Sequence, residues 1–282
     1  MALTLMYITN TPEVARIAEG YGVQRIWIDL EVLGKEERQK NMNTVKSNHT
    51  IEDVRKIAPI LTASEMLVRL NPWNRHSVQE INRVIDAGAD ILMLPMWRTV
   101  QEVEDFIKAV DGRVKTVLLL ETKEAEECLE QVLELQGIDE IHIGLNDLHL
   151  SYHLTFMFEL LTNGTVERIC KKIAAKGLPY GFGGIAKLGA GLIPAERIIL
   201  EHYRLGSTRA ILSRTFCDGT DVSNIDETRR TFRENMKLLR EFEDHIAGEK
   251  SPEKIYSQNQ KELAIAVADA VQKIREARRI AG

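Results

Sequence analysis

The sequence predicts an α/β protein, a (β/α)8 TIM barrel with an additional C-terminal helical arm. Short apolar runs such as LMYI, WIDL, ILMLP and VLLL alternate with amphipathic helical patterns along the chain. Nearly continuous apolar runs are typical of parallel strands that are covered on both faces. Eight such runs occur, each followed by a helical segment, and the 282 residues suit one barrel of roughly 250 residues plus an extension.

The elements follow one another in a regular β-α order. Helical patterns such as TPEVARIAEG, SVQEINRVIDAGA, TVQEVEDFIKAV and TKEAEECLEQVLEL separate the apolar runs. An open doubly wound sheet would carry a glycine-rich phosphate loop after its first strand, but TNTPEVA follows there, so the barrel is favoured. The expected strands are residues 3–8, 25–30, 66–70, 90–94, 115–120, 140–144, 180–183 and 209–213.

The last part of the chain exceeds what a barrel needs. A long polar helix is expected over residues 225–247, followed by the loop GEKSPEK and a final helix over 257–280. The final helix has an apolar stripe that must be buried, either by exchange with a partner subunit or by capping its own barrel. We therefore predict a barrel over residues 1–250 and a helical extension over 251–282. The stripe consists of Leu263, Val267, Ala270, Val271 and Ile274.

Composition excludes several classes of protein. The 37 Lys and Arg residues against 42 Asp and Glu residues give a net charge of −5, without the basic block that a nucleic-acid partner requires. No apolar run approaches the roughly 20 residues that cross a bilayer. The start MALTLMYITN lacks the features of a signal peptide, and three widely spaced cysteines favour reduced thiols. A cytoplasmic protein without a membrane or nucleic-acid partner is expected.

In a barrel of this kind the active site forms at the carboxyl ends of the strands. Glu121 and Asp147 end consecutive strands, and neighbouring strands lie about 4.8 Å apart. Two such carboxylates repel each other unless one is protonated or a cation lies between them, and Mg²⁺ suits the pair. Alternatively, Glu121 caps the helix that begins at ETKEA. The polar or glycine residues at strand ends are Asp29, Glu31, Arg69, Asn71, Glu121, Asn146, Asp147, Gly183, Gly184, Lys187, Ser213 and Arg214.

Arg69 is the second candidate functional residue. A guanidinium at the barrel mouth can bind a carboxylate or phosphate of a substrate, or it can form a structural ion pair with Asp29 or Glu31 on the adjacent strand. The histidines show no metal-ligand spacing, and His142, inside a strand, is expected to be a packed core residue. Trp27 is expected to pack in the core or at the rim.

These residues, in this order, resemble the HpcH/HpaI aldolase and citrate lyase β-subunit family of the phosphoenolpyruvate/pyruvate barrel superfamily. The matching pieces are IDLE, LVRLN, DAGADILMLPM, LLLETKEA and GLNDLHLS, which begin at residues 28, 67, 86, 118 and 144. The combination of ETxEA with GxxDL is fairly specific, whereas IDLE alone is weak.

The resemblance implies a Mg²⁺ or Mn²⁺ site at Glu121 and Asp147, and it implies that Arg69 holds the carboxylate and oxo group of a pyruvate-like fragment. Backbone amides around Asn146 and Asp147 would assist with the carboxylate, and Asn71 and Gly144 belong to the same substrate-binding motifs. Family members cleave or form a carbon–carbon bond through an enolate. They commonly form hexamers from dimers with exchanged C-terminal helices, so a homo-oligomer is expected.

Two positions depart from the family pattern. The aldolase branch has a histidine directly after the glutamate of IDLE and the citrate-lyase-like branch has an aspartate, but this chain has Val32. Leu119 replaces the glutamine that the aldolase branch carries two residues before the metal glutamate. The resemblance therefore supports metal and carboxylate binding by this chain better than it supports a proton-transfer step. The candidate bases are Glu31, which we count as catalytic together with Arg69, and Lys35 or His49.

The sequence thus favours a metal-dependent carbon–carbon lyase or aldolase that acts on a 2-oxo acid or a 3-hydroxy-acyl acid. One alternative is another enolate enzyme of the phosphoenolpyruvate/pyruvate class, a synthase or hydrolase. The other alternative is a non-catalytic barrel that binds an oxo acid, a hypothesis motivated by Val32 in the place of the expected base.

Overall fold

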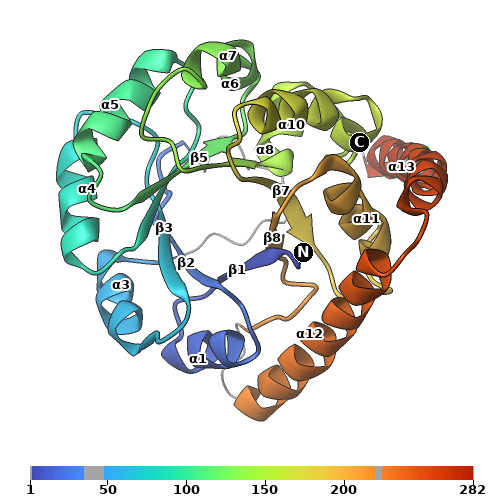
Figure 1. The fold of residues 1–282 in the computed structure, drawn as a ribbon, viewed down its shortest axis with the longest axis horizontal. Coiled ribbons are helices and arrows are strands. Elements are labelled where there is room, and N and C mark those ends of the chain that lie inside the picture. The colour runs from blue at the N-terminus through green and yellow to red at the C-terminus, as the bar shows by residue number, and fades with distance from the viewer. Residues whose placement is uncertain (1, 35–47, 220–223, 282) are drawn as a thin grey trace.

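Eight parallel strands close into a barrel in the order β1 to β8 (Figure 1). The computed structural model describes residues 2–34, 48–219 and 224–281. Each strand pairs with the next, and β8 returns to pair with β1, which confirms the predicted fold class. The strands are β1 (Thr4–Ile8), β2 (Arg25–Asp29), β3 (Glu65–Arg69), β4 (Ile91–Leu94), β5 (Lys115–Leu120), β6 (Glu140–Ile143), β7 (Tyr180–Ile185) and β8 (Arg209–Leu212).

Every apolar run that was expected to be a strand forms one, with boundaries within two residues of the prediction. The reason is the two-sided burial of a parallel barrel, which requires apolar side chains both inside and outside. A small inner cluster around Met6, Trp27, Leu67 and Leu119 fills the barrel. A larger outer cluster packs the strands against the helices.

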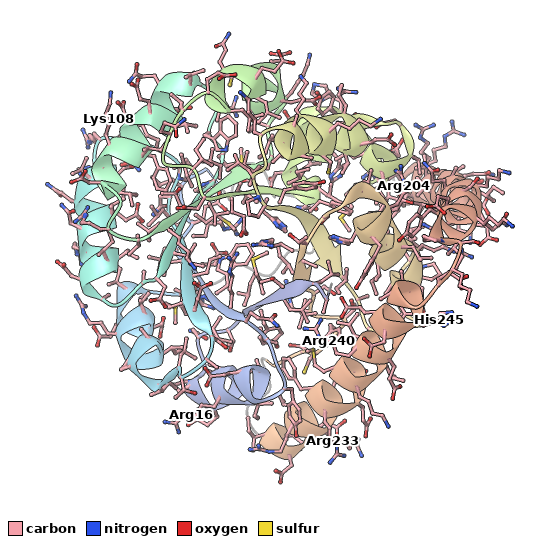
Figure 2. All side chains as sticks on the ribbon, in the orientation of Figure 1. Arg16, Lys108, Arg204, Arg233, Arg240 and His245 are labelled. Atoms are coloured by element: carbon pink, nitrogen blue, oxygen red, sulfur yellow. The ribbon has the colours of Figure 1, made fainter. Side chains whose placement is uncertain are left out.

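The helices surround the barrel, and charged side chains such as Arg16, Lys108 and Arg233 point outward from them (Figure 2). The first group consists of α1 (Pro12–Gly20), α3 (Ile51–Ile57), the 3₁₀-helix η1 (Ala58–Ile60), α4 (Ser77–Asp86), α5 (Val100–Val110), α6 (Lys123–Glu127) and α7 (Leu129–Val132). The second consists of α8 (Leu145–Ser151), α9 (Glu159–Thr162), α10 (Thr165–Ala175), α11 (Ala195–Leu205), α12 (Ile225–Ala247) and α13 (Pro252–Ala281).

The last two helices have the predicted positions, although α13 begins five residues earlier than expected. Helix α12 packs against α1 and holds the start of the chain, because Glu243 accepts the Leu3 N–H at 2.8 Å and Arg240 donates to the Leu3 carbonyl at 3.2 Å. Helix α13 packs on α11 and α9 of its own chain (Figure 1). Leu263 and Val267 are buried there. Capping of its own barrel is therefore the arrangement seen, and exchange between subunits stays a prediction.

Two further expectations concern the whole chain. Cys128, Cys170 and Cys217 are free thiols. Within the described residues, no helix combines the length and the apolar character that a membrane span requires.

Candidate active site

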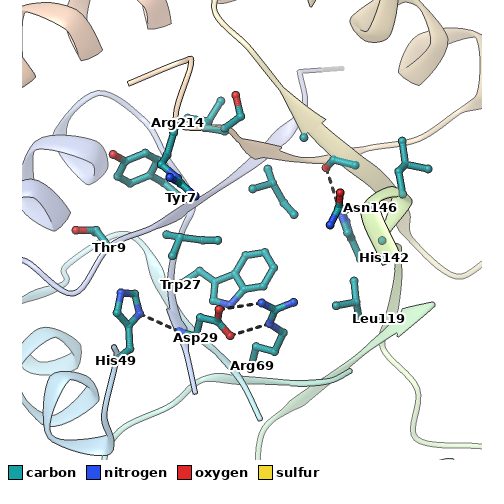
Figure 3. Close-up of a pocket in the computed structure, with 18 of the residues that line it drawn as sticks. Tyr7, Thr9, Trp27, Asp29, His49, Arg69, Leu119, His142, Asn146 and Arg214 are labelled. Carbon is teal, nitrogen blue, oxygen red and sulfur yellow. Dashed lines mark hydrogen bonds and ion pairs between the residues drawn. The ribbon is translucent and has the colours of Figure 1, made fainter. Parts of the chain in front are cut away.

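A cavity of about 580 Å³ opens at the carboxyl ends of the strands, where residues from the ends of β1, β2, β3, β5, β6, β7 and β8 form its wall (Figure 3). The barrel brings together side chains that lie more than 200 residues apart in the sequence, from Tyr7 to Arg214. The predicted site residues that line this cavity are Arg69, Glu121, Gly144, Asn146 and Asp147.

Glu121 follows β5 directly and is buried, with 3% of its surface exposed. Its Oε1 accepts the N–H of Met96 at 3.1 Å, and Met96 has a positive φ of 54°, which is strained for a residue with a side chain. The alternative in which Glu121 caps α6 is wrong. Thr122 is the N-cap residue, and its hydroxyl accepts the Ala125 N–H at 3.1 Å, so the Glu121 carboxylate is left to the cavity.

Asp147 lies in the first turn of α8, which begins directly after β6. Burial raises the pKa of Glu121 well above its ordinary value, and the negative charge of Asp147 raises it further. Gly144 makes room for this arrangement, because a Cβ at this position would meet Glu121 Oε2 at 2.8 Å and Glu121 Cβ at 2.9 Å. The structure therefore places the two predicted carboxylates in mutual repulsion at one cavity wall.

The carboxylate pair matches the chemistry of a hard divalent cation. Within the described residues, no group of three or more His, Cys, Asp and Glu side chains is arranged as a metal site. An ion at Glu121 and Asp147 would have two protein carboxylates and would complete its shell with water or substrate oxygens. This donor set is typical of Mg²⁺, which keeps several waters and uses one or two carboxylates.

Arg69 is held tightly by the acids that were expected as its alternative partners. Its Nε and Nη2 each donate to an Asp29 carboxylate oxygen at 2.8 Å (Figure 3). Nη2 also lies 3.3 Å from Glu31 Oε2. The guanidinium carbon also lies 5.3 Å from the centre of the Trp27 ring. Although burial disfavours the charge, Asp29 and Glu31 raise the pKa of Arg69, so it stays a cation. The structural ion pair of Arg69 is confirmed, and because the paired side chain still lines the cavity, its binding of a substrate carboxylate stays a prediction.

Two predicted residues do not line the cavity. Glu31 is buried, with 2% of its surface exposed, and its described contact is with Arg69. The Asn71 side-chain oxygen accepts the N–H groups of Val32 and Leu33 at 3.0 and 3.1 Å, while its amide donates to Glu80 at 2.7 Å. Asn71 therefore holds the start of the loop after β2, and a direct role in substrate binding stays a prediction.

The proposed bases occupy different surroundings. Lys35 lies outside the described residues. His49 lines the cavity, and its Nδ1 accepts the N–H of Asp29 at 3.0 Å. An accepting Nδ1 carries no proton, so the neutral ring has its proton on Nε2 and can donate from there.

His142 is fully buried, as expected, and burial lowers its pKa to about 4, so it is neutral at pH 7.

The sequence interpretation missed the part that Tyr7 and Trp27 have in the cavity. Trp27 lines the wall beneath Arg69. The Tyr7 hydroxyl donates to the Cys217 carbonyl at 3.0 Å and accepts the Gly219 N–H at 3.1 Å, which fastens the segment after β8. The sequence feature that could have indicated the role of Tyr7 is its hydroxyl group within the apolar run LMYI. A buried tyrosine hydroxyl needs a hydrogen-bond partner.

A closed parallel barrel with an acidic cavity at the carboxyl ends of its strands defines a (β/α)8-barrel enzyme. Residues 3–158 match the model of the family described as HpcH/HpaI aldolase/citrate lyase, and this match covers more than half of the 282 residues. The chain therefore belongs to the HpcH/HpaI aldolase/citrate lyase family, a family of lyases and aldolases, which confirms the resemblance seen in the sequence.

Solved structures show the same fold at low sequence identity. The HpcH/HpaI aldolase from Desulfitobacterium hafniense DCB-2 has a TM-score of 0.59 and 14% identity, over 75% of this chain and 86% of that one. An HpcH/HpaI aldolase/citrate lyase family protein from Burkholderia cenocepacia J2315 has a TM-score of 0.59 and 14% identity, over 81% and 95%. Citrate synthase SbnG has a TM-score of 0.57 and 14% identity, over 81% and 94%. No curated protein sequence matches the chain.

Proposed function

We propose that this protein is a divalent-metal-dependent carbon–carbon lyase or aldolase that acts through an enolate. Its substrate would be a 2-oxo acid of the pyruvate or oxaloacetate type, or a 3-hydroxy-acyl acid. The observation that carries the proposal is the carboxylate pair of Glu121 and Asp147 at one wall of the cavity, where burial, and then the negative charge of Asp147, raise the pKa of Glu121. A bound Mg²⁺ or Mn²⁺ would remove this repulsion.

The family membership adds the type of reaction to this site. A metal ion held by Glu121 and Asp147 would act as a Lewis acid toward the oxo group of the substrate. Arg69 adds a positive charge in the same cavity, and its Nε and Nη2 are held by Asp29 and Glu31. Its Nη1 makes no hydrogen bond within the described residues and would be the donor to substrate oxygen. Backbone amides of Asn146 and Asp147 would bind the substrate carboxylate.

In the cleavage direction, the hydroxyl group of the substrate loses a proton and the carbon–carbon bond breaks. The electron pair of that bond stays on the departing three-carbon fragment as an enolate, which then takes up a proton. A fixed cation such as Arg69 favours this step because it stabilises negative charge that develops in the transition state. For the proton itself, Glu31, Lys35 and His49 stay predictions.

Hydrogen–deuterium exchange at the methyl group of pyruvate tests the proposal without knowledge of the second reactant. Pyruvate in D₂O should lose its methyl protons in the presence of enzyme and Mg²⁺, as followed by proton NMR, and chelation with EDTA should stop the exchange. Full exchange in EDTA would contradict the metal dependence. Magnesium-dependent binding of pyruvate without exchange would contradict the enolate chemistry.

One observation favours a second candidate, a non-catalytic barrel that binds an oxo acid. Val32 stands where the family has a residue for proton transfer, and its hydrocarbon side chain supplies no acid or base there. The side chain is 58% exposed. The same NMR experiment separates the candidates, since a binding protein would bind pyruvate with Mg²⁺ and leave its methyl protons in place.

A further inference from the structure

We propose that Arg214 forms a second anion-binding subsite, which takes the charged group of an anionic acceptor, a carboxylate or phosphate carried by the aldehyde that reacts with the enolate. This inference rests on the proposed function and names the class of the second substrate. The chemistry that recognises it is a guanidinium, which binds either anion through paired N–H donors.

Arg214 faces the cavity from the wall opposite Arg69. It follows β8, and in the closed barrel β8 lies three strands from β3, which carries Arg69, and three strands from β5, which leads to Glu121. Figure 3 shows Arg214 and Arg69 on opposite sides of the pocket. An acceptor that reaches Arg214 would therefore extend away from the carboxylate pair, across a cavity much larger than a three-carbon acid needs.

The two arginines of the cavity differ in how they are paired. Arg69 is held by Asp29 and Glu31 and is 13% exposed at its side chain. Arg214 is exposed, and within the described residues it forms no ion pair and no side-chain hydrogen bond. Asp218 is the other charged residue that lines this side, and within the described part of the chain no ion pair joins it to Arg214. A guanidinium without an ion pair among the described residues is therefore the group that an incoming anion would meet on this side of the cavity.

The backbone that carries Arg214 is firmly held, although its side chain is exposed. Ser213 donates its N–H to the Ile185 carbonyl at 2.9 Å, and the Tyr7 hydroxyl bonds to the Cys217 carbonyl and the Gly219 N–H. Asn235 on α12 donates to the Phe216 carbonyl at 2.6 Å. The turn is thus fixed on both sides of Arg214. Ligand binding would therefore cost little entropy for ordering this backbone.

The neighbouring residues give this subsite polar atoms and space. The Ser213 and Thr215 hydroxyls are 2.7 Å apart, and Ser213 lines the cavity together with Gly183 and Gly184. A Cβ at Gly184 would lie 3.8 Å from Ser213 Cβ, an ordinary van der Waals contact, so Gly184 borders Ser213 directly in the cavity wall. Loops after the seventh and eighth strands of such barrels frequently bind phosphate, which agrees with this placement.

Matched acceptors test the subsite in aldol addition to pyruvate with Mg²⁺. The pairs are glyceraldehyde 3-phosphate with glyceraldehyde, and glyoxylate with acetaldehyde. In Arg214→Gln, kcat/KM for the charged acceptors should fall about 10- to 100-fold, as expected for the loss of a charge-assisted hydrogen bond. The neutral acceptors should stay within about twofold, and Arg214→Lys should restore part of the loss. A larger effect with one charged acceptor identifies that anion as the group that is bound.

Lys187→Gln is the matched control, because Lys187 is exposed near the end of β7, carries the same charge and does not line the cavity. Equal losses for charged and neutral acceptors in Arg214→Gln, or a loss of the same size in Lys187→Gln, would overturn the proposal. Deuterium exchange into pyruvate alone should be unchanged in Arg214→Gln.

Absence of exchange in the wild type would instead remove the proposed function. Calorimetric titration with glyceraldehyde 3-phosphate then decides on the subsite by itself. Binding that weakens in Arg214→Gln and not in Lys187→Gln supports it, and equal affinity in all three proteins, or no binding by the wild type, overturns it.

Discussion

Both ends of the barrel bury charged side chains, but acids are paired with cations at the amino end and two acids face each other at the carboxyl end. At the amino ends of the strands, Arg25 donates to Glu140 through two hydrogen bonds of 2.6 and 3.0 Å and lies 3.3 Å from Glu65. Arg209 donates to Glu140 at 2.7 Å, and Lys115 lies 2.5 Å from Glu65. Two acids thus meet three cations, and each carboxylate contacts two of them.

At the carboxyl ends, four acids surround one arginine. Asp29 and Glu31 share Arg69, while Glu121 and Asp147 repel each other across the cavity wall. Arg214 and Asp218, further out on the wall, cancel in charge. At this end burial, and then the charge of Asp147, raise the pKa of Glu121, and a carboxyl group perturbed in this way inside a cavity marks a candidate place for a ligand or cation.

The difference teaches which charges serve stability and which serve function. A buried charge with complete partners is satisfied within the fold, and its removal leaves the partner uncompensated. A buried carboxylate held against another one costs stability, and it persists because the site needs it. The same substitution, glutamate to glutamine, should therefore have opposite consequences at the two ends.

The largest effect is expected for Glu121→Gln. Deuterium exchange into pyruvate with Mg²⁺ should fall more than about 100-fold, since even the outer partners of metal ligands are worth 10- to 100-fold. The free energy of unfolding in urea, measured with EDTA, should stay the same or rise, because the repulsion with Asp147 is removed. A protein that keeps wild-type exchange, or that unfolds more easily, would contradict the assignment of Glu121 to a metal site.

The second effect is expected for Glu140→Gln at the other end. Arg25 is buried and would lose its carboxylate partner, so the free energy of unfolding should fall by about 3 kcal/mol or more. Lys115→Gln is the control, because this lysine is 57% exposed at its side chain and its ion pair should contribute about 1 kcal/mol or less. Exchange activity per folded molecule should be unchanged in both variants. Equal stability losses in the two variants would mean that burial does not distinguish these pairs.

The sequence allows prediction of the carboxyl-end carboxylates and not of the amino-end network, for a geometric reason. Glu121 and Asp147 follow apolar strands that are consecutive in the chain, so their proximity follows from strand order alone. Arg25 and Glu140 are the first residues of β2 and β6, which face each other only because the barrel closes. In the sequence they look like ordinary surface charges beside a strand.

The contacts of Arg69 with Asp29 and Glu31 show a similar limit of prediction from the sequence. Strand order brings Arg69 beside Asp29, and the register pairs these two residues directly. The sequence therefore predicts both an ion pair and a substrate contact for Arg69. It cannot predict which nitrogens of the guanidinium form the ion pair and which are left for the substrate. The loop that carries Val32 is likewise fixed by Asn71, whose side chain reaches back over 38 and 39 positions to two backbone amides.

The smallest effect, and the one that sharpens the comparison most, is the pH dependence of stability. Burial would raise the pKa of Glu140, but hydrogen bonds and charge from Arg25, and then the charge of Arg209, lower it below its ordinary value. A lowered carboxyl pKa gives stability that is present above the pKa of the unfolded chain and is lost as pH falls through the folded pKa. The stability difference between wild type and Glu140→Gln should therefore shrink as pH falls below about 4.3.

Glu121 has the opposite sign, because its pKa in the folded protein is raised. Its folded form holds the proton more tightly than the unfolded chain, so the wild type gains stability as pH falls from the raised pKa toward about 4.3. The advantage of Glu121→Gln over wild type, measured in urea with EDTA, should thus be largest near neutral pH and vanish in acid. Buried neutral histidines such as His142 lower the stability of all these proteins in acid, and subtraction between variants removes their contribution. Parallel curves for wild type and both variants would show that neither end has the electrostatics inferred from its contacts.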